Sequence, residues 1–175
     1  MVGTVAFASS GAMVGIRRRL DVFGIIVLGM TTAVGCGILR DVILGLTPPG
    51  VFVNSSYALV ALVVSILLFA IVCNKEAVLK SSYLRTFEQV MNYCDAIGLG
   101  VFTVIGIHTA YTLGYRQKFF LVFLGILTGI GGGIIRDLMV RTMPFILYKH
   151  VYAVAAFAGA MVCVYLTPVN LYLGM

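Results

Sequence analysis

The chain has 175 residues, of which 61% are hydrophobic and only 10% are charged, and its mean hydropathy is +1.10. Soluble domains carry about 25% charged residues, so this composition excludes a soluble protein and predicts a polytopic protein of the lipid bilayer. The net charge of +6 does not indicate nucleic acid as a partner, because the basic residues lie in short loops between apolar segments.

Six apolar segments are candidates for membrane helices, each of which needs about 20 residues. They are Val2–Ile16, Val22–Leu46, Tyr57–Cys73, Cys94–Leu113, Phe119–Val140 and Tyr152–Leu166. The first segment is short, and arginines follow it rather than precede it, so it is read as a membrane helix and not as a secretory signal. The predicted organisation is all-α, with a membrane repeat at 1–73, a cytoplasmic linker at 74–93, a second membrane repeat at 94–166 and a C-terminal tail at 167–175.

The distribution of Lys and Arg predicts the orientation. The loops after the first, third and fifth segments hold Arg17, Arg18, Arg19, Lys75, Lys80, Arg85, Arg141 and Lys149. The opposite loops hold only Arg116 and Lys118. Because basic loops stay in the cytoplasm, we expect a multi-pass protein of the prokaryotic plasma membrane with its N-terminus outside.

An internal repeat divides the chain into two halves. Gly35-Cys36-Gly37-Ile38-Leu39-Arg40-Asp41 returns 96 residues later as Gly131-Gly132-Gly133-Ile134-Ile135-Arg136-Asp137. Further matches at an offset of 96 are Gly29 with Gly125, Thr32 with Thr128 and Pro48 with Pro144, and matches at an offset of 95 are Phe7 with Phe102 and Gly11 with Gly106. Three helices in each repeat is an odd number, so the second copy must enter the membrane from the other side. The sequence therefore predicts two inverted three-helix repeats.

The glycine blocks are expected near the middle of the membrane. Cys36 lies ten residues before Leu46, which is about 15 Å of helix and half of a core of about 30 Å. Glycine in a helix costs about 1 kcal/mol relative to alanine, so we expect a kink or unwinding in the second and fifth helices. Unwound backbone at this depth is tolerated only in a protein interior or along a water-filled cavity, where its carbonyls can coordinate a cation. The alternative is that the glycines only allow helices to pack closely.

The charged pairs that follow the glycines also need partners. A charged residue at the centre of a membrane helix costs about 2.5–3.5 kcal/mol on insertion scales. Neighbours on a helix point about 100° apart, so we expect Arg40 to pair with Asp137, and Asp41 with Arg136, across the pseudo-two-fold axis. Asp95, at the start of the fourth segment, is a further candidate partner. The alternative role is a set of salt bridges that only locks the helices together.

These blocks resemble the prokaryotic members of the trimeric intracellular cation channel family, which has long been grouped with proteins labelled as possible glycine transporters. The residues that carry the resemblance are Gly11-Ala12, Thr31–Asp41, Asp95–Leu99, Gly125–Asp137 and Tyr152-Ala153. The resemblance implies a homotrimer in which each protomer has its own pore between the two glycine-kinked helices. It implies monovalent cations, potassium above all, as the permeant ions, and no cofactor apart from a permeant potassium or sodium ion.

The chain departs from the family pattern at three points. Cys36 replaces the middle glycine of the first block, and Thr109 stands where such proteins often carry a lysine. The seventh helix that the resemblance implies is missing from the expected segments.

Three functions fit these observations. A passive cation channel is the leading hypothesis, and a secondary transporter of a small solute such as glycine is the alternative. A membrane subunit without flux is disfavoured, because unused charges inside the membrane are costly. No pattern typical of catalytic triads, metal sites or nucleotide-binding loops is visible, which argues against an enzyme. A transporter needs a carboxylate for its coupling ion, and arginines are expected to occupy Asp41, Asp95 and Asp137, which favours the channel.

Overall fold

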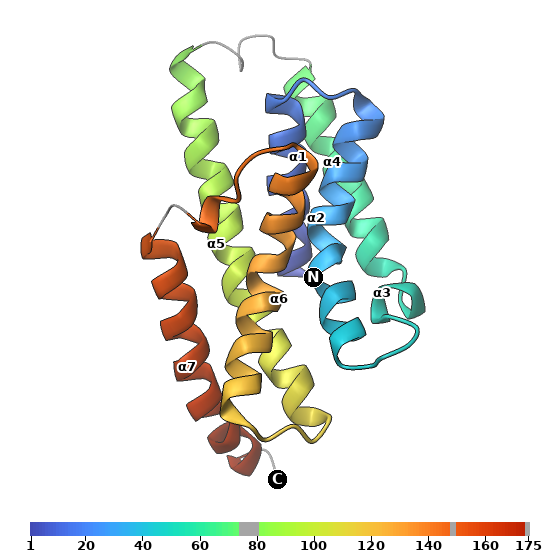
Figure 1. Cartoon of the computed structure of the whole chain (residues 1–175). Coiled ribbons are helices and arrows are strands. Elements are labelled where there is room, and N and C mark those ends of the chain that lie inside the picture. Colours follow the sequence, from blue (N-terminus) through green and yellow to red (C-terminus); the bar gives the residue numbers. More distant parts are fainter. Residues whose placement is uncertain (74–80, 148–149, 174–175) are drawn as a thin grey trace.

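The computed structural model describes residues 1–73, 81–147 and 150–173. Its long helices are α1 (Val2–Arg17), α2 (Val22–Ile43), α4 (Ser56–Cys73), α5 (Ser81–Thr112), α6 (Lys118–Met139) and α7 (His150–Leu173). Two short helices, α3 (Gly50–Val53) and the 3-10 helix η2 (Phe145–Leu147), follow α2 and α6 (Figure 1). No strand occurs in these residues, so the all-α prediction is confirmed.

Within the described residues, three helical segments are long and apolar enough to cross a membrane: Val22–Ile43, Thr86–Thr112 and Lys118–Met139. Shorter apolar helical stretches occur at Val2–Arg17, Ser56–Val72 and Val154–Leu166. Together these segments correspond to the six that the sequence predicts. Many of their large apolar side chains are exposed on the outside of the bundle, as expected for a protein surrounded by lipid.

Two helices are longer than predicted. α5 begins at Ser81, inside the expected linker, because no glycine or proline interrupts the chain before Gly98. Its polar beginning contacts the end of α1, where Arg17 Nη1 lies 3.0 Å from Glu88 Oε1. α7 continues to Leu173, inside the expected C-terminal tail. Lys75, Lys80 and Lys149, which contributed to the predicted orientation, lie outside the described residues.

The two halves of the chain are inverted with respect to each other. The C-terminal ends of α1, α4 and α6 lie toward one end of the molecule, and those of α2 and α5 lie toward the other (Figure 1). In the first half, a Cβ atom on Gly11 would lie 2.6 Å from Thr32 Oγ1 and 2.8 Å from Gly29 Cα. The second half repeats this contact.

A Cβ atom on Gly106 would lie 2.7 Å from Thr128 Oγ1 and 3.2 Å from Gly125 Cα. The hydroxyls of Thr32 and Thr128 each donate to the carbonyl four residues earlier, at 2.6 Å. Residues that match in sequence therefore make the same contacts in space, and the inverted repeat is a property of the packing as well as of the sequence.

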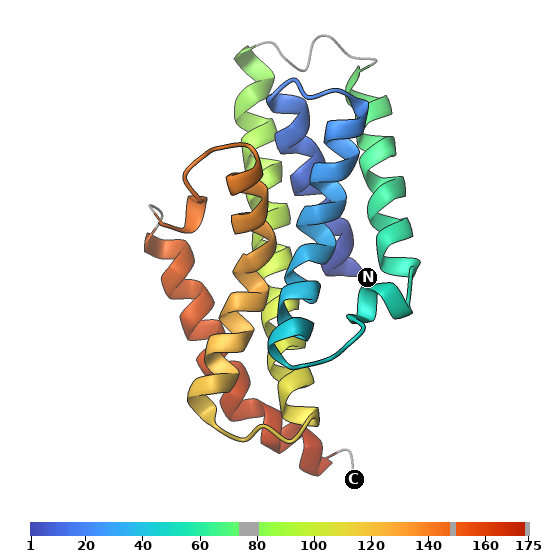
Figure 2. The same ribbon diagram turned by 45° about the vertical axis from the view of Figure 1, so that its right-hand side comes forward.

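The glycine blocks do not unwind their helices. α2 is helical from Val22 to Ile43 and α6 from Lys118 to Met139, straight through both blocks. The two helices pack against each other at this level (Figure 2), so any bend occurs within a continuous helix. Because the helical hydrogen bonds are kept, the backbone carbonyls that unwinding would have released are not available to a cation.

Replacing Gly11 with alanine should lower the stability of the protein. The new methyl group would lie within 3 Å of the Thr32 hydroxyl and of the α2 backbone, and overpacking of this kind costs about 1–3 kcal/mol. Gly100→Ala is the matched control, because a Cβ atom there meets nothing within 4 Å. Thermal unfolding in detergent should show a lower midpoint for Gly11→Ala and an equal or higher one for Gly100→Ala. Equal midpoints for the two variants would contradict the close contact between α1 and α2.

Candidate functional site

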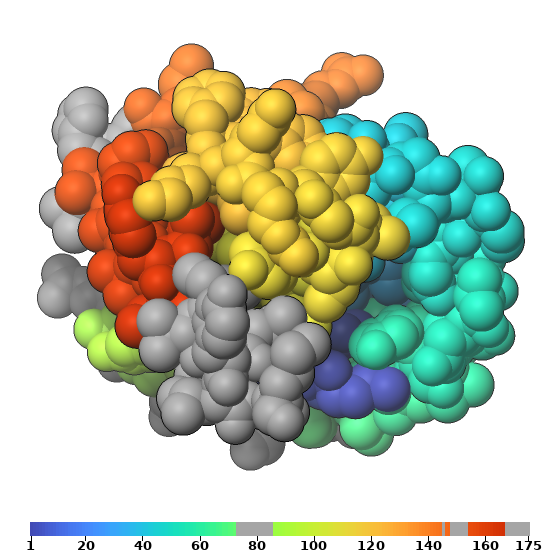
Figure 3. All heavy atoms as spheres, turned by 90° about the horizontal axis from the view of Figure 1, so that it is seen from below, coloured from blue at the N-terminus to red at the C-terminus, as the bar shows by residue number. Residues whose placement is uncertain are grey.

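Two cavities occupy equivalent positions in the two repeats. The first, which we call the α3-side cavity, has a volume of about 320 Å³. Its lining residues are Thr4, Ala33, Val34, Gly37, Arg40, Asp41, Gly50, Val51, Tyr57, Phe102, Ile105 and Thr109. Figure 3 shows the molecule from the end where α2 and α5 finish. In this view the N-terminal end of α1 (blue) lies between the surface formed by α3 and α4 (teal) and the surface formed by the end of α5 and the start of α6 (yellow).

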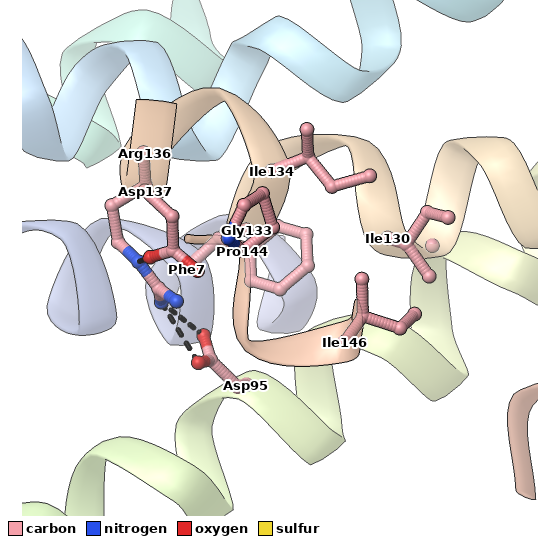
Figure 4. Close-up of a pocket in the computed structure, with 10 residues that line it drawn as sticks. Phe7, Asp95, Ile130, Gly133, Ile134, Arg136, Asp137, Pro144 and Ile146 are labelled. Atoms are coloured by element: carbon pink, nitrogen blue, oxygen red, sulfur yellow. Dashed lines mark hydrogen bonds and ion pairs between the residues drawn. The ribbon is translucent and has the colours of Figure 1, made fainter. Parts of the chain in front are cut away.

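The second cavity, which we call the η2-side cavity, has a volume of only about 20 Å³ (Figure 4). That is room for about one water molecule. Its lining residues are Phe7, Asp95, Gly129, Ile130, Gly133, Ile134, Arg136, Asp137, Pro144 and Ile146.

The inverted repeat relates these two linings. Ala33, Val34, Gly37, Arg40, Asp41 and Gly50 of the first correspond to Gly129, Ile130, Gly133, Arg136, Asp137 and Ile146 of the second, and Phe102 corresponds to Phe7. Each repeat thus supplies one cavity with the end of its glycine block and with its Arg-Asp pair.

The six residues of the glycine blocks separate into two groups. Gly37 and Gly133 border the cavities, since a Cβ atom on Gly37 would meet nothing within 4 Å and one on Gly133 only Arg136 Nη2 at 3.8 Å. The other four lie between helices. A Cβ atom on Gly35 would lie 2.9 Å from Ile135 Cδ1, and one on Gly132 would lie 2.5 Å from the Thr32 carbonyl oxygen.

Gly131 and Cys36 complete this contact between α2 and α6. A Cβ atom on Gly131 would lie 3.5 Å from Cys36 Cβ. Cys36 is fully buried and its thiol donates weakly to the Ala33 carbonyl, with a sulfur–oxygen distance of 3.8 Å. The alternative of close packing therefore describes Gly35, Cys36, Gly131 and Gly132, whereas Gly37 and Gly133 face space.

Arg136 is the centre of a buried charge cluster. Its Nη1 atom donates to Asp95 Oδ1 and Oδ2 at 2.6 and 2.8 Å, and its Nε atom donates to Asp137 Oδ1 at 2.9 Å (Figure 4). It also donates to the Ser10 hydroxyl. The side chains of Arg136, Asp95 and Asp137 are 3%, 6% and 10% exposed, so the cluster connects α1, α5 and α6 in the interior.

Arg40 has a simpler environment. Its Nε and Nη2 atoms donate to Asp41 Oδ1 at 2.8 and 2.6 Å. The other carboxylate oxygen of Asp41 accepts a hydrogen bond from the Gly50 backbone N–H at 2.8 Å. Asp41 therefore neutralises Arg40 and at the same time fixes the start of α3 at the edge of the α3-side cavity.

These contacts correct the expected pairing. No ion pair joins Arg40 to Asp137, or Asp41 to Arg136, anywhere in the described chain, because the two Arg-Asp pairs lie in different cavities. The argument from helical directions fails because an arginine side chain is long enough to fold back onto the carboxylate of the next residue. Asp95, the further candidate, does pair with Arg136. Ser10 was not foreseen, since a lone serine in an apolar helix gives no signal in the sequence.

A pair of phenylalanine rings lies between the cavities. Phe7 lines the η2-side cavity, Phe102 lines the α3-side cavity, and their ring centroids are 5.1 Å apart with an interplanar angle of 18°. Both side chains are buried. A Cβ atom on Gly3 would lie 3.0 Å from the Phe102 ring, and one on Gly98 would collide with Phe7, so matching glycines hold the matching rings. The sequence did signal this pair, through the offset of 95 that relates Phe7 to Phe102.

A third cavity of about 120 Å³, which we call the vestibule, adjoins the η2-side cavity. Its lining residues are Val14, Arg17, Arg18, Met91, Arg136, Asp137, Val140, Thr142 and Met143. It shares Arg136 and Asp137 with the η2-side cavity, so the charge cluster lies between the two. Within the part of the chain that the structure covers, no group of three or more His, Cys, Asp and Glu side chains could hold a metal ion.

A double-mutant cycle should reveal which charges are coupled. Asp95→Asn and Arg136→Gln should show a coupling energy of about 0.5–3 kcal/mol in unfolding experiments, because the two groups are in contact. Arg136→Gln alone should cost about 3–5 kcal/mol, since it leaves buried carboxylates without their cation. The control cycle, Arg40→Gln with Asp137→Asn, should give a coupling energy within about 0.5 kcal/mol of zero. A larger coupling in the control cycle would favour the originally expected pairs.

Comparisons with known proteins agree with this architecture. The sequence profile of the family described as "Glycine transporter" matches residues 1–72 and 92–168. A membrane protein of Deinococcus radiodurans is 40% identical over 162 residues, which cover 91% of this chain and 71% of the relative. The inner membrane protein YadS of Escherichia coli K12 is 36% identical over 162 residues, which cover 93% of this chain and 74% of that protein.

Solved structures extend the comparison to the fold. A prokaryotic TRIC channel crystallised in 0.5 M KCl superposes with a TM-score of 0.85 and 31% identity, over 95% of this chain and 81% of the channel. The trimeric intracellular cation channel orthologue from Rhodobacter sphaeroides gives a TM-score of 0.83 and 33% identity with the same coverage. These neighbours are channels and not enzymes. The chain is a membrane protein that belongs to the prokaryotic trimeric intracellular cation channel family, whose sequence profile carries the description glycine transporter.

Proposed function

We propose that the chain is a passive channel for monovalent cations of the potassium type, with one pore in each protomer. The pore runs from the α3-side cavity, past Phe7 and Phe102, to the η2-side cavity and the vestibule. The observation that carries this proposal is the pair of repeat-related cavities that face each other across two stacked rings. Chains of similar fold and sequence that are described as cation channels support it further.

The route is closed in this structure. The rings of Phe7 and Phe102 are buried and stacked, and the cavity beyond them has room for about one water molecule. Opening requires these rings to separate and the η2-side cavity to widen. An apolar constriction of this kind can block ions by excluding water, without a charged barrier.

The charges along the route suit a cation. Asp41 neutralises Arg40, whereas Arg136 faces the two carboxylates of Asp95 and Asp137. Both arginines that line the two cavities thus donate to carboxylates, so their positive charge does not bar a cation from the route.

The proposed assembly and orientation follow the family and the charge distribution. The orthologue from Rhodobacter sphaeroides is described as a trimeric intracellular cation channel, and we infer a homotrimer for this chain as well. The ends of α1 and α6, with their arginines, face the cytoplasm, which puts the N-terminus outside. The proposed channel uses no cofactor, and the ion that passes through it is potassium or sodium.

A secondary transporter of a small solute such as glycine is the second candidate. The family profile carries that description, and the α3-side cavity, at about 320 Å³, is of a size that small ligands occupy. One wide and one narrow cavity in inverted repeats is also the arrangement expected for alternating access. Transport of this kind requires a carboxylate for its coupling ion. The carboxylates beside the cavities accept hydrogen bonds from arginines instead.

Recordings from single molecules separate the two candidates. Purified protein in a planar bilayer with a potassium gradient should give discrete unitary currents that reverse near the potassium equilibrium potential. Saturable uptake of a solute without unitary steps would contradict the channel and favour the transporter.

A substitution at Gly37 should block flux without disturbing the fold. Gly37→Leu puts a side chain into the α3-side cavity from a position where a Cβ atom meets no neighbour. Gly100→Leu is the matched control, since its Cβ atom also meets nothing and Gly100 does not line that cavity. For Gly37→Leu we expect at least a tenfold loss of potassium flux from liposomes, which corresponds to a rise of about 1.4 kcal/mol in the activation free energy of permeation. For Gly100→Leu we expect little change. Normal flux through a folded Gly37→Leu protein would exclude this cavity as part of the pore.

A further inference from the structure

A groove outside the proposed pore separates the beginning of α2 from the end of α6. Its volume is about 400 Å³. We call it the α2–α6 groove, and its lining residues are Arg18, Leu20, Gly24, Val27, Leu28, Met139, Val140 and Arg141. Its described lining therefore combines an apolar wall with two arginines and has no acidic side chain.

The two arginines are available to bind a ligand. Arg18 and Arg141 are exposed, and neither forms an ion pair with any of the described residues. The nearby Asp21 carboxylate instead accepts the Gly24 backbone N–H at 2.8 Å and caps α2. The groove thus offers two cationic donors whose charge the described chain does not neutralise.

The corresponding place in the other repeat is filled by the chain itself. There Tyr115 and Phe120 stand in place of Leu20 and Gly24, and their ring centroids lie 4.9 Å apart. Leu44, which corresponds to Val140, is 8% exposed and belongs to the core cluster that contains Leu124. The groove is therefore a difference between the repeats and not a consequence of their shared fold.

The backbone at Arg141 has an unusual conformation. α2 and α6 end in the same way, with Leu46 N–H donating to the Asp41 carbonyl and Thr142 N–H donating to the Asp137 carbonyl. The residue before each donor has a positive φ, 71° at Gly45 and 55° at Arg141. Glycine is the residue that such a helix end favours, and any other residue there costs free energy. The end of α1 shows the same exchange, since Arg19 has a φ of 56° and Gly114, at the end of α5, has a φ of 94°. Arginines in the conformation that favours glycine therefore occur on this side of the molecule, beside the groove at Arg141 and next to it in sequence at Arg19.

We propose that the α2–α6 groove binds an anionic phospholipid. Its phosphate lies between Arg18 and Arg141, and an acyl chain lies along Val27 and Leu28. Arg18 directly follows α1 and Arg141 is the second residue after α6, on the side of the molecule where Arg17, Arg18 and Arg19 gather. This is where lipid headgroups meet a membrane protein. Free phosphate would leave the apolar wall uncovered, and a neutral lipid would leave the arginines without a counter-charge.

Binding there would also affect the proposed pore. Arg18 and Val140 line the vestibule as well as the groove. A lipid phosphate at Arg18 reduces the positive charge at the mouth of the vestibule, so cations enter more readily. This consequence rests on the proposed channel function, whereas the lipid site itself does not.

The test measures lipid binding by native mass spectrometry of the purified full chain. Dioleoyl-phosphatidylglycerol and dioleoyl-phosphatidylcholine share their acyl chains and differ in charge, and wild-type protein should bind the former more tightly. Removing both arginines, as Arg18→Gln with Arg141→Gln, should weaken phosphatidylglycerol binding about 25-fold, or about fivefold for each arginine. Arg19→Gln, the matched control in the same loop, should change it less than about twofold.

Two further variants test the geometry. Arg18→Lys with Arg141→Lys keeps both charges and should retain most of the binding, which shows that the double glutamine variant does not act by unfolding. Val27→Phe narrows the groove without changing its charge and should also weaken binding. Phenylalanine is the residue at the corresponding position of the other repeat, Phe123.

Four outcomes would overturn the proposal. They are unchanged binding in the double glutamine variant, an equal loss in Arg19→Gln, equal competition by glycerol phosphate without acyl chains, and loss of the oligomer together with the lipid, which would make the groove a contact between subunits. Absence of unitary currents would contradict the channel and leave the binding result as it stands.

Discussion

The structure depends on how Arg136 is neutralised inside the helix bundle. A buried ion pair is costly to break because the remaining charge stays desolvated, so the helices that supply its partners cannot separate independently. Asp137 comes from the same helix, Asp95 from α5 and Ser10 from α1. Three helices from both repeats therefore share one set of bonds. Arg40 has no such role, since it donates to the adjacent Asp41, whose other carboxylate oxygen accepts the Gly50 backbone N–H at the start of α3.

Close helix approach is the second constraint, and it explains which part of the glycine prediction failed. The apolar segments were sufficient to place the long helices, and the matches at offsets of 95 and 96 were sufficient to place the inverted repeat. Both depend only on residue types along the chain. Whether glycine unwinds a helix depends on its neighbours. At Gly132 the neighbours are the Thr32 carbonyl and the Phe7 ring, and a packed helix keeps its hydrogen bonds. Only Gly37 and Gly133 lack such neighbours, and no single-residue rule distinguishes them from the others.

The charges show a similar limit. Helical geometry gives the direction of a Cα–Cβ bond, but an arginine side chain extends several bonds beyond it and can return to the adjacent carboxylate. The sequence singled out Arg136, Asp137 and Asp95, and it offered Asp95 as a candidate partner, but the pairs it expected between Arg40 and Asp137 and between Asp41 and Arg136 do not form. Phe7 and Phe102 were visible as a match at an offset of 95, yet only their stacking shows that they separate two cavities. Residue identity was available from the sequence, whereas contact was not.

The inverted repeat finally explains why the two cavities differ so much in size. The repeats share the glycine block, the Arg-Asp pair and one ring of the phenylalanine pair, so they can form the same cavity twice. In the second repeat Arg136 binds Asp95 at the cavity wall, and Ile146 stands where the first repeat has Gly50. A carboxylate and a larger apolar side chain leave room for about one water molecule in place of about 320 Å³. A symmetric scaffold thus acquires a narrow side and a wide side from a few residues, and in the proposed channel these residues are where flux is controlled.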